Sequence, residues 1–518
     1  MKLKEKKILW VDDEIDMLKS HQIFLEEKGF FVKGVSSGDE AVKTLKAEEF
    51  DLVLLDETMP GKSGLQTLQE IKEIAANIPV IMITKNEAEG LMEQAIGMKI
   101  DDYLLKPINP LQIYSAAKRL LDSHRIQEGA VSKDYLQVFQ RIDEQVSARP
   151  DLEEWVKIHF ELSQWDIEFD KFSATGMDQI HLDLRKKCNF EFGTFVEENY
   201  IDWINSDRKP WMSPDVFDKF VFPHLRERKK VYFIVIDCMR LDQWLTIEDL
   251  LIPFFNIQRE SYVSILPTAT PYSRNSIFSG LFPVDIQKRY PSYWLERSRD
   301  EFSKNRFEQE LMQEQMNGAG FGNLSTKYIK IYETDEANEI RKQVNSYRGI
   351  DFVSMVFNFL DILAHGRSQS EILQEIAPDE RAFRSLMRSW FTHSALFDIL
   401  QQISRHNATV IITTDHGSIL GQKASLVHGN RDTSTNLRYK FGENINGDPK
   451  QTLMLRKPVD YKLPAESPSK NYILAKENYY FVYPTRFHEY ERQYQGTFQH
   501  GGISLEEMII PCITMRPR

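Results

Sequence analysis

The chain has 518 residues, of which 42% are hydrophobic and 27% charged, and its formal net charge is −12 at pH 7. This length exceeds what a single hydrophobic core supports, so two to four domains are expected. The acidic balance excludes broad binding to nucleic acid or anionic membranes through a basic surface, but not a phosphate-bearing substrate, because a bound metal ion can supply positive charge locally.

The beginning of the chain and its cysteines indicate a cytoplasmic protein without a membrane span. The first residues, MKLKEKKILWVDDE, lack the apolar core of a signal peptide. The longest apolar runs, such as VYFIVI at 231–236, are far shorter than the roughly 18 residues that span a bilayer. Cys188, Cys238 and Cys512 are spaced too widely for a disulfide framework or a CxxC zinc site.

Five short apolar runs within the first 125 residues alternate with helix-like segments and predict a doubly wound parallel sheet. The runs are KILWV at 7–11, FVKGV at 31–35, DLVLLD at 51–56, IPVIMIT at 78–84 and DYLLK at 102–106. Function gathers at the carboxyl ends of such strands, and these ends carry Asp12, Asp13, Asp56, Thr84 and Lys106. Converging carboxylates repel one another unless a hard cation lies among them, so we expect a Mg²⁺ site here.

Residues 5 to 123 resemble the receiver domain of bacterial response regulators. DETMPGKSG at 56–64 matches the acceptor-loop pattern D-x-x-M-P-x-x-x-G, and a Lys-Pro pair follows the fifth strand. The resemblance implies a flavodoxin-like receiver that a cognate sensor histidine kinase phosphorylates on Asp56. It further implies roles for the other strand-end residues: Asp12 and Asp13 as Mg²⁺ ligands, Thr84 and Lys106 as phosphoryl contacts, and Tyr103 as the switch aromatic.

Residues 126–225 have apolar side chains at three- and four-residue spacing, which is typical of amphipathic helices. We expect a small helical bundle that couples the first part of the chain to the last. His159, Trp165 and His181 lie among core aromatics in this stretch and are interpreted as packing residues. No helix-turn-helix or basic cluster suited to a DNA groove stands out, so the output is expected downstream.

Four buried strands are predicted between residues 226 and 518, with chemically distinctive residues just beyond their ends, as in a parallel sheet. VYFIVID ends on Asp237. YVSIL is followed by a threonine-rich turn and a helix expected to start within 274–277. DFVSMVFNFLDILAH carries Asp361 and His365, which share one face if this stretch is helical. ATVIITTDH ends in Asp415 and His416.

The late segment QHGGISLEEMIIPCI at 499–513 adds His500 beside two glycines, followed by a predicted strand. Three carboxylates and three imidazoles are a suitable ligand set for two Zn²⁺ ions. A pair of ions about 4 Å apart clamps both oxygens of a phosphoryl transfer. A threonine hydroxyl on such an ion becomes a nucleophile, and Thr270 in PTATP is the candidate. The residues alone therefore predict metal-assisted hydrolysis of a phosphate ester.

The order Asp, Thr, D-x-x-x-H, DH, HGG resembles the alkaline phosphatase superfamily over about residues 230 to 516. PTATPYSRNSIFSGLFP is similar to the nucleophile segment of nucleotide pyrophosphatase/phosphodiesterases, P-T-x-T-x-x-N-x-x-S-x-x-x-G-x-x-P. The resemblance assigns one metal to Asp361, His365 and His500, the other to Asp237, Asp415 and His416, and the nucleophile to Thr270. The family's oxyanion-stabilising asparagine falls on Ser273, which leaves Ser273, Arg274 and Asn275 as candidate donors to the substrate.

A further cluster lies in LVHGNRDTSTNLRYKFG at 426–442, where His428, Arg431 and Arg438 stand among hydroxyl residues. Fork-shaped arginines suit a second phosphate or a nucleotide backbone. A solvated loop with ordinary salt bridges is the alternative. Together with HGGISLEEMIIP, this stretch resembles the PglZ-type branch of the superfamily.

The whole chain resembles the PorX-type response regulators of the type IX secretion system. We therefore expect a multidomain α/β protein: a receiver at 1–125, a helical bundle linker at 126–225 and a PglZ-type alkaline-phosphatase-like domain at 226–518. The resemblance implies a zinc-dependent phosphodiesterase for linear or cyclic oligonucleotides and a homodimer promoted by phosphorylation. The alternative is a signalling scaffold whose vestigial metal domain binds a sigma factor or a secretion component.

Overall fold

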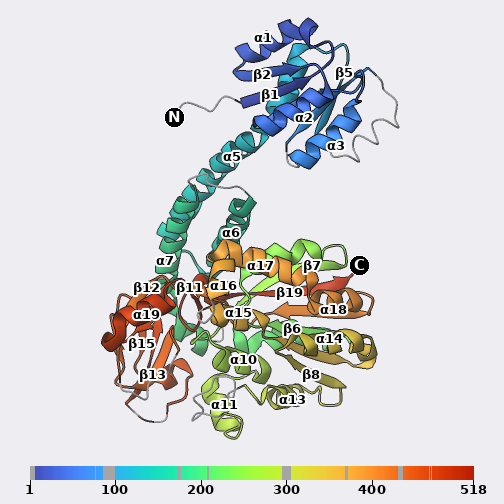
Figure 1. The fold of residues 1–518 in the computed structure, drawn as a ribbon. Coiled ribbons are helices and arrows are strands. Elements are labelled where there is room, and N and C mark those ends of the chain that lie inside the picture. Colours follow the sequence, from blue (N-terminus) through green and yellow to red (C-terminus); the bar gives the residue numbers. More distant parts are fainter. Residues whose placement is uncertain are drawn as a thin grey trace. The chain divides into compact units, whose positions relative to one another are not determined.

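The computed structural model describes residues 6–75, 78–85, 100–171, 177–206, 209–294, 305–367, 371–429, 436–465, 467 and 469–518. The chain divides into two compact units, Met1–Leu136 and Gln137–Arg518 (Figure 1). Helix α5 (Pro110–Ser147) continues from the first unit into the second. The predicted boundary at residue 125 falls inside this helix, so the division into three domains stays a prediction.

The first unit contains a parallel five-stranded sheet in the order β2-β1-β3-β4-β5, as the five apolar runs predict. The strands are β1 Lys6–Val11, β2 Phe30–Val35, β3 Leu52–Asp56, β4 Val80–Thr84 and β5 Asp102–Leu105. Besides α5, the described helices are α1 Lys19–Glu27, α2 Gly38–Ala47 and α3 Gly64–Ile74. Alternate residues of β1 pack on opposite faces: Leu9 lies in a core with Leu68 of α3, and Trp10 in one with Ile113 of α5. Burial on both faces explains why these strands read as continuous apolar runs.

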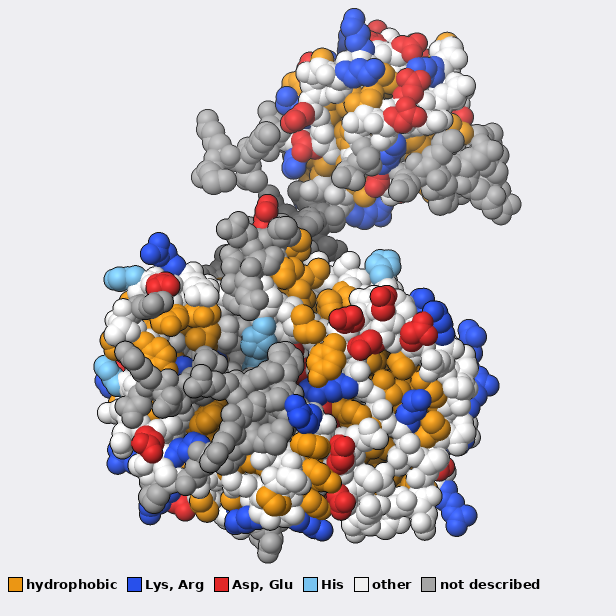
Figure 2. Space-filling model, turned by 60° about the horizontal axis from the view of Figure 1, so that its bottom comes forward, with side chains coloured by type: hydrophobic (Ala, Val, Ile, Leu, Met, Phe, Trp, Pro, Cys, Tyr) orange, Lys and Arg blue, Asp and Glu red, His pale blue; other side chains and the backbone are white. Residues whose placement is uncertain are grey.

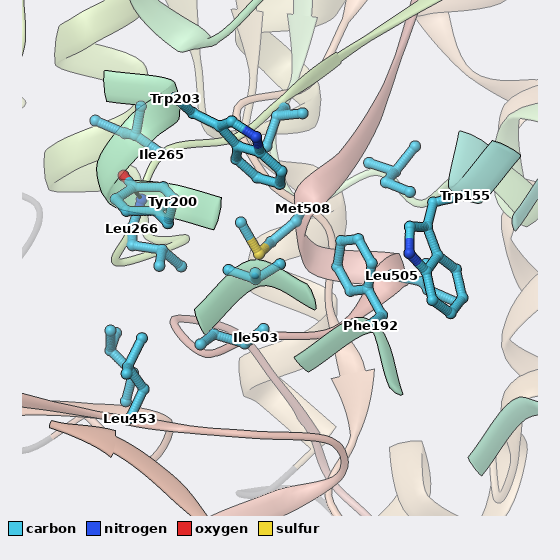
Figure 3. Packing of buried hydrophobic residues seen from close by; sticks show 14 of the residues in the cluster. Trp155, Phe192, Tyr200, Trp203, Ile265, Leu266, Leu453, Ile503, Leu505 and Met508 are labelled. Carbon is cyan, nitrogen blue, oxygen red and sulfur yellow. Dashed lines mark hydrogen bonds between the residues drawn. The ribbon is translucent and has the colours of Figure 1, made fainter. Parts of the chain in front are cut away.

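The second unit begins with long helices that pack on the rest of that unit. After α5 come α6 Leu152–Lys171 and α7 Met177–Asn205, then a π-helical turn Phe217–Val221 and α8 Phe222–Arg226. Trp155, Phe192 and Tyr200 of α6 and α7 share one hydrophobic core with Leu266 and Leu505 of the C-terminal half (Figure 3). The helical segment is therefore built into this unit through a common core. His159 and His181 are buried in it, as expected of packing residues.

A six-stranded sheet in the order β7-β19-β10-β6-β9-β8 forms the centre of the second unit. Its strands are β6 Lys230–Ile236, β7 Phe255–Val263, β8 Thr326–Ile331, β9 Phe352–Phe357, β10 Ala408–Thr413 and β19 Ile509–Pro517. The four strands expected to run parallel, β6, β7, β9 and β10, do so, and the sheet is mixed because β19 runs antiparallel to both of its neighbours, β10 and β7. The chain end thus inserts between two strands whose carboxyl ends lie beside the start of β19.

Helices pack on both faces of this sheet (Figure 1), whereas α19 Phe487–Tyr494 packs on one of the smaller sheets. The other helices after α8 are α9 Leu241–Ile247, α10 Thr270–Ser279, α11 Pro283–Arg289, α13 Glu308–Gly318, α14 Thr334–Gln343, α15 Phe359–Arg367, α16 Glu371–Ile376, α17 Glu380–His393, α18 Ala395–Ile403 and α20 Leu505–Met508. Helix α10 starts at Thr270, before the expected 274–277. The reason is Pro271, which is well suited to the first turn of a helix because it has no N–H to satisfy.

Three small sheets complete the second unit: β11-β18, β14-β12-β17 and β13-β16-β15. Their strands are β11 Ile419–Leu420, β12 Lys423–His428, β13 Tyr439–Glu443, β14 Asn446–Gly447, β15 Thr452–Leu455, β16 Lys470–Ala475, β17 Tyr479–Val482 and β18 Phe498–Gln499. All three cysteines are unpaired and buried. Within the described residues, no helix has the length and hydropathy to cross a bilayer. On the face seen in Figure 2, acidic and basic side chains are interspersed.

Candidate metal centre

The first unit brings three carboxylates together at the carboxyl end of its sheet. Asp12 follows β1 and Asp56 ends β3, both are buried, and with exposed Asp13 they form a cluster of candidate ligand atoms that lie within 4.8 Å of one another. Lys106 Nζ donates to Asp12 Oδ2 and Asp56 Oδ2, at 2.9 Å each. Burial raises the pKa of Asp56, against the lowering effect of Lys106. The cluster has the hard oxygen donors that suit Mg²⁺.

Two further residues predicted for this cluster lie on the neighbouring strands. Thr84 ends β4, and its backbone carbonyl accepts a hydrogen bond from the Lys106 backbone N–H. Tyr103 lies on β5 and is 39% exposed, so its ring faces solvent in this structure. The structure thus places Thr84 beside Lys106 and leaves the Tyr103 ring outside the core.

In the second unit, the edge of the central sheet assembles all six predicted metal ligands. Asp237 follows β6, Asp361 and His365 lie one turn apart on α15 after β9, and Asp415 and His416 follow β10. His500 precedes β19, whose reversed direction brings the start of this strand to the same edge. The six residues form two clusters, Asp361–His365–His500 and Asp237–Asp415–His416.

The first of these clusters, Asp361–His365–His500, joins one carboxylate to two imidazoles. Asp361 Oδ1 lies 3.3 Å from His365 Nε2 and 3.5 Å from His500 Nε2, and the two Nε2 atoms are 3.0 Å apart. Burial would raise the pKa of Asp361, but the two histidines outweigh it and hold that pKa well below its usual range. The His365 side chain is 40% exposed, so this cluster is open to solvent on one side.

The second cluster, Asp237–Asp415–His416, is fully buried. His416 Nε2 lies 3.8 Å from Asp237 Oδ1 and 3.7 Å from Asp415 Oδ2. Burial, together with repulsion from Asp237, raises the pKa of Asp415 to about 7, and burial also raises the pKa of Asp237. Burial lowers the pKa of His416 to about 4. Two buried carboxyls and a neutral imidazole therefore face one another.

Thr270, at the start of α10, contacts the Asp237–Asp415–His416 cluster. Its Oγ1 lies 3.0 Å from His416 Nε2, and the His416 ring stacks on that of His500 with 4.2 Å between the centroids. His416 Nδ1 lies 3.0 Å from the carbonyl of Gly417, which can only accept, so Nδ1 carries the proton. The lone pair of Nε2 is thereby directed toward Thr270 and the two carboxyls.

Two backbone features shape the ligand turns. A Cβ on Gly417 would lie 1.9 Å from the carbonyl oxygen of Glu506, and one on Gly502 would lie 2.3 Å from that of Ala475, so only glycine fits at either position. Cys238, directly after Asp237, has a φ of 66°, a left-handed conformation that is strained for a residue other than glycine. The backbone therefore reverses direction immediately after this ligand.

The predicted substrate donors after Thr270 are occupied by contacts within the protein. Ser273 Oγ lies 2.8 Å from Ser264 Oγ, and Asn275 Nδ2 donates to the carbonyl of Pro271. Arg274 Nη1 donates to Asp237 Oδ2 at 2.6 Å and its Nε donates to Glu308 Oε1 at 2.6 Å. All three residues are buried on α10, so in this structure they support the site from within.

The loop candidates are placed differently from one another. Arg438 is fully buried, and its guanidinium donates to both carboxylate oxygens of Glu507, so it underlies the turn after His500. His428 is exposed at the end of β12. Arg431 lies outside the described residues.

Sequence reasoning missed two residues that contact this site. Glu308 pairs with Arg274, and Asn305 Nδ2 donates to the carbonyl of Thr270 at 3.1 Å. Both lie before or within the first turn of α13, where no motif marks them. What distinguishes Glu308 is that its carboxylate is buried, and burial cannot be read from a sequence.

The donor set fits bound metal ions. Asp237 Oδ1 and Asp415 Oδ2 are buried, and neither accepts a hydrogen bond from a donor among the described residues. Leaving such oxygens unsatisfied is costly in a native fold, and a cation between them removes both that cost and the repulsion of the carboxylates. Mixed carboxylate and imidazole ligands favour a borderline ion such as Zn²⁺.

Comparison with known families identifies each part of the chain. The profile described as "BREX system PglZ alkaline phosphatase-like domain" matches residues 216–515, more than half of the chain. "Response regulator receiver domain" matches residues 8–118, and "PorX response regulator linker domain" matches residues 125–204. The three matches follow one another in the order that the sequence predicts.

Two curated relatives each match less than a quarter of this chain. The transcriptional regulatory protein ResD of Bacillus subtilis is 35% identical over 117 residues, 23% of this chain and 48% of the relative. A CpxR homologue of Haemophilus influenzae is 36% identical over 117 residues, 22% of this chain and 50% of the relative. This chain thus spans about half the length of the curated relatives it matches.

Two solved structures match a similar share of this chain. A CheY-like receiver protein from Methanospirillum hungatei is 27% identical and covers 24% of this chain and 99% of its own, with a TM-score of 0.23. The response regulator TrrA of Thermotoga maritima, solved with Mg²⁺ and BeF, is 31% identical and covers 22% of this chain and 99% of its own, with a TM-score of 0.21. The PglZ profile covers more than half of the chain, and the receiver and linker profiles match the residues before it. The chain therefore belongs to the PglZ alkaline phosphatase-like family and has the architecture of a PorX-type response regulator.

Proposed function

We propose that this response regulator is a two-zinc phosphodiesterase in which Thr270 is the nucleophile. The observation that carries the proposal is the position of Thr270 Oγ1, 3.0 Å from a ligand of one candidate metal cluster and beside the ring stack that joins it to the other. A hydroxyl that contacts one three-ligand cluster, with a second cluster next to it, suits phosphoryl transfer better than binding alone.

The chemistry follows from the residues around Thr270. Its Oγ1 attacks the phosphorus, a P–O bond to Thr270 forms, and the bond to the alcohol leaving group breaks. The hydroxyl proton passes to solvent and the leaving alkoxide takes one up. A water molecule then cleaves the phosphothreonine, releasing a phosphate monoester and restoring the hydroxyl. Bound metal ions would supply a lowered hydroxyl pKa and charge stabilisation at the leaving oxygen.

Within this scheme the chain's own groups hold the nucleophile in place. The His416 Nδ1–H bond to Gly417 fixes the ring so that Nε2 faces Thr270. Asn305 holds the carbonyl of Thr270, and Pro271 starts the helix behind it. Preorganisation of this kind lowers the barrier because the reacting atoms need little reorientation.

The resemblance to PorX-type regulators supports the finer parts of the proposal. The substrates are linear or cyclic oligonucleotide phosphodiesters, and the pathway controlled is type IX secretion. A sensor histidine kinase phosphorylates Asp56 with Mg²⁺ bound by Asp12 and Asp13, and phosphorylation promotes a homodimer. Each of these statements is a proposal that rests on the family.

The test compares wild type, Thr270→Ala and Thr270→Ser, all full length. We expect two zinc ions per chain in each, measured by plasma emission spectrometry. Turnover of bis-p-nitrophenyl phosphate should fall by about 10³-fold or more in Thr270→Ala, because the nucleophile is lost, and be partly retained in Thr270→Ser. Wild type that holds two zinc ions and cleaves neither this diester nor p-nitrophenyl phosphate would defeat the enzymatic assignment. Monoester turnover alone would defeat the diesterase assignment.

One observation favours a second candidate function, a signalling scaffold that binds a sigma factor or secretion component through the metal domain. The side chains at the family's oxyanion position and its neighbours, Ser273 and Asn275, are buried and bonded within the protein. A site without that donor would hold metals and react slowly. The inactive outcome of the same assay would favour this function.

A further inference from the structure

Helix α7 of the linker reaches two of the turns that carry site residues. Figure 3 shows Tyr200 beside Leu266, which precedes Thr270 by four positions, and Phe192 beside Leu505, which follows His500 by five. The two turns are distant in sequence and belong to different strands of the sheet. A single helix that packs on both couples their positions.

The first contact joins α7 to the nucleophile turn. The backbone N–H of Leu266 donates to the hydroxyl of Tyr200 at 2.9 Å. Tyr200 is 1% exposed, so water cannot replace this hydroxyl without entering the core. The turn from Leu266 to Thr270 is thus anchored at its start to a side chain of the linker.

The second contact joins α7 to the turn after His500. Asn189 Oδ1 accepts the backbone N–H of Leu505 at 2.8 Å, and Asn189 Nδ2 donates to Glu506 Oε2 at 3.1 Å. Arg185, one turn earlier, donates to Glu506 Oε1 and to Glu380 Oε2. Asn189 and Glu506 are both buried. Asn189 of α7 therefore bonds both the backbone and a side chain of this turn.

This turn also contacts the other metal-ligand loop. The carbonyl of Glu506 lies against Gly417, where even a Cβ would approach it to 1.9 Å, and Gly417 follows His416. Glu507 Oε1 accepts the backbone N–H of Gly502, two positions after His500. A shift of the turn 504–507 therefore moves the backbone next to His416 as well as that next to His500.

We propose that α7 is a structural part of the metal site, in which Asn189 and Arg185 are positioning residues for His500 and His416 and Tyr200 is a positioning residue for Thr270. The inference rests on the proposed function in assigning those site roles. A displacement of α7 along or about its axis would therefore change metal affinity through one contact and the position of the nucleophile through the other.

A purely packing role for α7 predicts something different. Apolar contacts such as those of Trp155 and Phe192 would hold the helix in place without the polar groups. The three polar residues also fix the orientation of the site turns, because each one hydrogen-bonds to a backbone N–H or a carboxylate of such a turn. Groups bonded directly to metal ligands typically affect metal affinity by about 10- to 100-fold, and residues that act through a neighbouring turn should act at the lower end of that range.

The metal arm of the test uses zinc alone and full-length protein. Competition with a chromophoric chelator measures both zinc affinities for wild type, Asn189→Ala and the matched control Asn199→Ala. Asn199 lies on the same helix and donates to the carbonyl of Phe195 within it. We expect Asn189→Ala to weaken at least one affinity by about tenfold or more, and Asn199→Ala to leave both within about twofold.

Two results would decide this arm against the inference. Unchanged affinities in a folded Asn189→Ala protein, or an equal loss in Asn199→Ala, would overturn the inference. If Asn189→Ala does not fold by circular dichroism, Asn189→Ser carries the same comparison. A wild type that binds zinc but cleaves no phosphate ester would defeat the proposed function and leave this inference intact, because its readout is affinity.

The nucleophile arm compares Tyr200→Phe with Tyr347→Phe, whose hydroxyl donates to Gln343 in another part of the unit. Hydrogen–deuterium exchange followed by mass spectrometry should show faster exchange of the peptide that contains Leu266 to Thr270 in Tyr200→Phe alone. Turnover should fall severalfold with KM unchanged, because the contact orients the nucleophile and does not touch substrate. Unchanged exchange in this peptide would overturn the role of Tyr200.

Discussion

Asp237 and Asp415 bring two buried carboxyls to one cluster, and their electrostatics govern when it accepts a metal ion. Burial and mutual repulsion raise the pKa of Asp415 to about 7, and burial raises that of Asp237. Near neutral pH the pair therefore holds a proton in the metal-free protein. A cation must displace this proton, because only the deprotonated oxygens bind it.

Zinc affinity of the second cluster should therefore depend on pH. Below pH 7 Asp415 is protonated, and we expect the affinity to fall by about tenfold for each unit of decrease. Above pH 7 this contribution should level off. Chelator competition between pH 5.5 and 8.5 measures the slope, and calorimetry in two buffers measures proton release, which should be larger at pH 6 than at pH 8. A flat profile below pH 7 would show that no proton competes.

Arg274 is the fixed cation of this cluster, and its removal should be costly. In Arg274→Met, the carboxylates of Asp237 and Glu308 stay buried but no longer pair with the guanidinium of Arg274. Breaking a buried pair by removing one partner costs about 3–5 kcal/mol, so the metal-free protein should lose stability of that order. Zinc should restore part of it, because the ion supplies positive charge at Asp237.

The measurement is urea unfolding with and without zinc, and Arg388→Met is the control. Arg388 pairs with Asp249 at the surface, where the side chains are 40% and 59% exposed, so its loss should cost at most about 1 kcal/mol. Equal losses in the two variants would contradict the role given to Arg274.

Among the elements, those with an internal pattern were predictable. Five apolar runs give the strands of the first sheet, and a three- and four-residue spacing gives α6 and α7. Five of the six candidate ligands come after the strands β6, β9 and β10, and His500 comes before β19, so strand ends located them in the sequence. Polar contacts between distant elements could not: nothing in the sequence pairs Asn189 with Leu505 or Arg274 with Glu308. The direction of β19 was also hidden, because strand polarity in a sheet depends on tertiary neighbours.

Helix α6 carries a histidine whose burial makes the second unit sensitive to acid. Burial lowers the pKa of His159 to about 4, against about 6.5 in an unfolded chain. Between these values the unfolded chain binds more protons than the folded one, so stability falls as pH falls from 6.5 to 4. We expect this residue alone to cost about 2 kcal/mol between pH 7 and pH 5.

Urea unfolding followed by tryptophan fluorescence tests this expectation, since Trp155 lies on the same helix. His159→Gln removes the titrating group, so the difference in stability between pH 7 and pH 5 should shrink by about that amount. A variant that keeps the full difference would place the acid sensitivity elsewhere in the unit.

For the molecule as a whole, the continuous helix α5 is the covalent route between the units. It starts at Pro110, after the Lys106 that bonds Asp12 and Asp56, and ends in the core that contains Trp155. Ile113 of α5 is buried under the first sheet, and Ile142 is buried in the second unit. Each end of α5 is therefore anchored by burial in the core of its own unit.

Phosphorylation of Asp56 should shift an association equilibrium of the full chain. Without a phosphoryl group, Lys106 pairs with the carboxylates of Asp12 and Asp56. A phosphoryl group on Asp56, or BeF₃⁻ with Mg²⁺, adds negative charge beside Lys106 and draws the Lys106 ammonium toward it. Receivers couple such a change to a two-state surface, and a twofold symmetric dimer is the common result.

Light scattering after size exclusion should show a rise in mass with BeF₃⁻ and Mg²⁺ for wild type, and none for Asp56→Ala. Lys106→Met should bind the mimic and fail to respond, because the residue that moves is absent. An unchanged mass for wild type at every concentration would contradict the association and would favour a switch that acts within one chain.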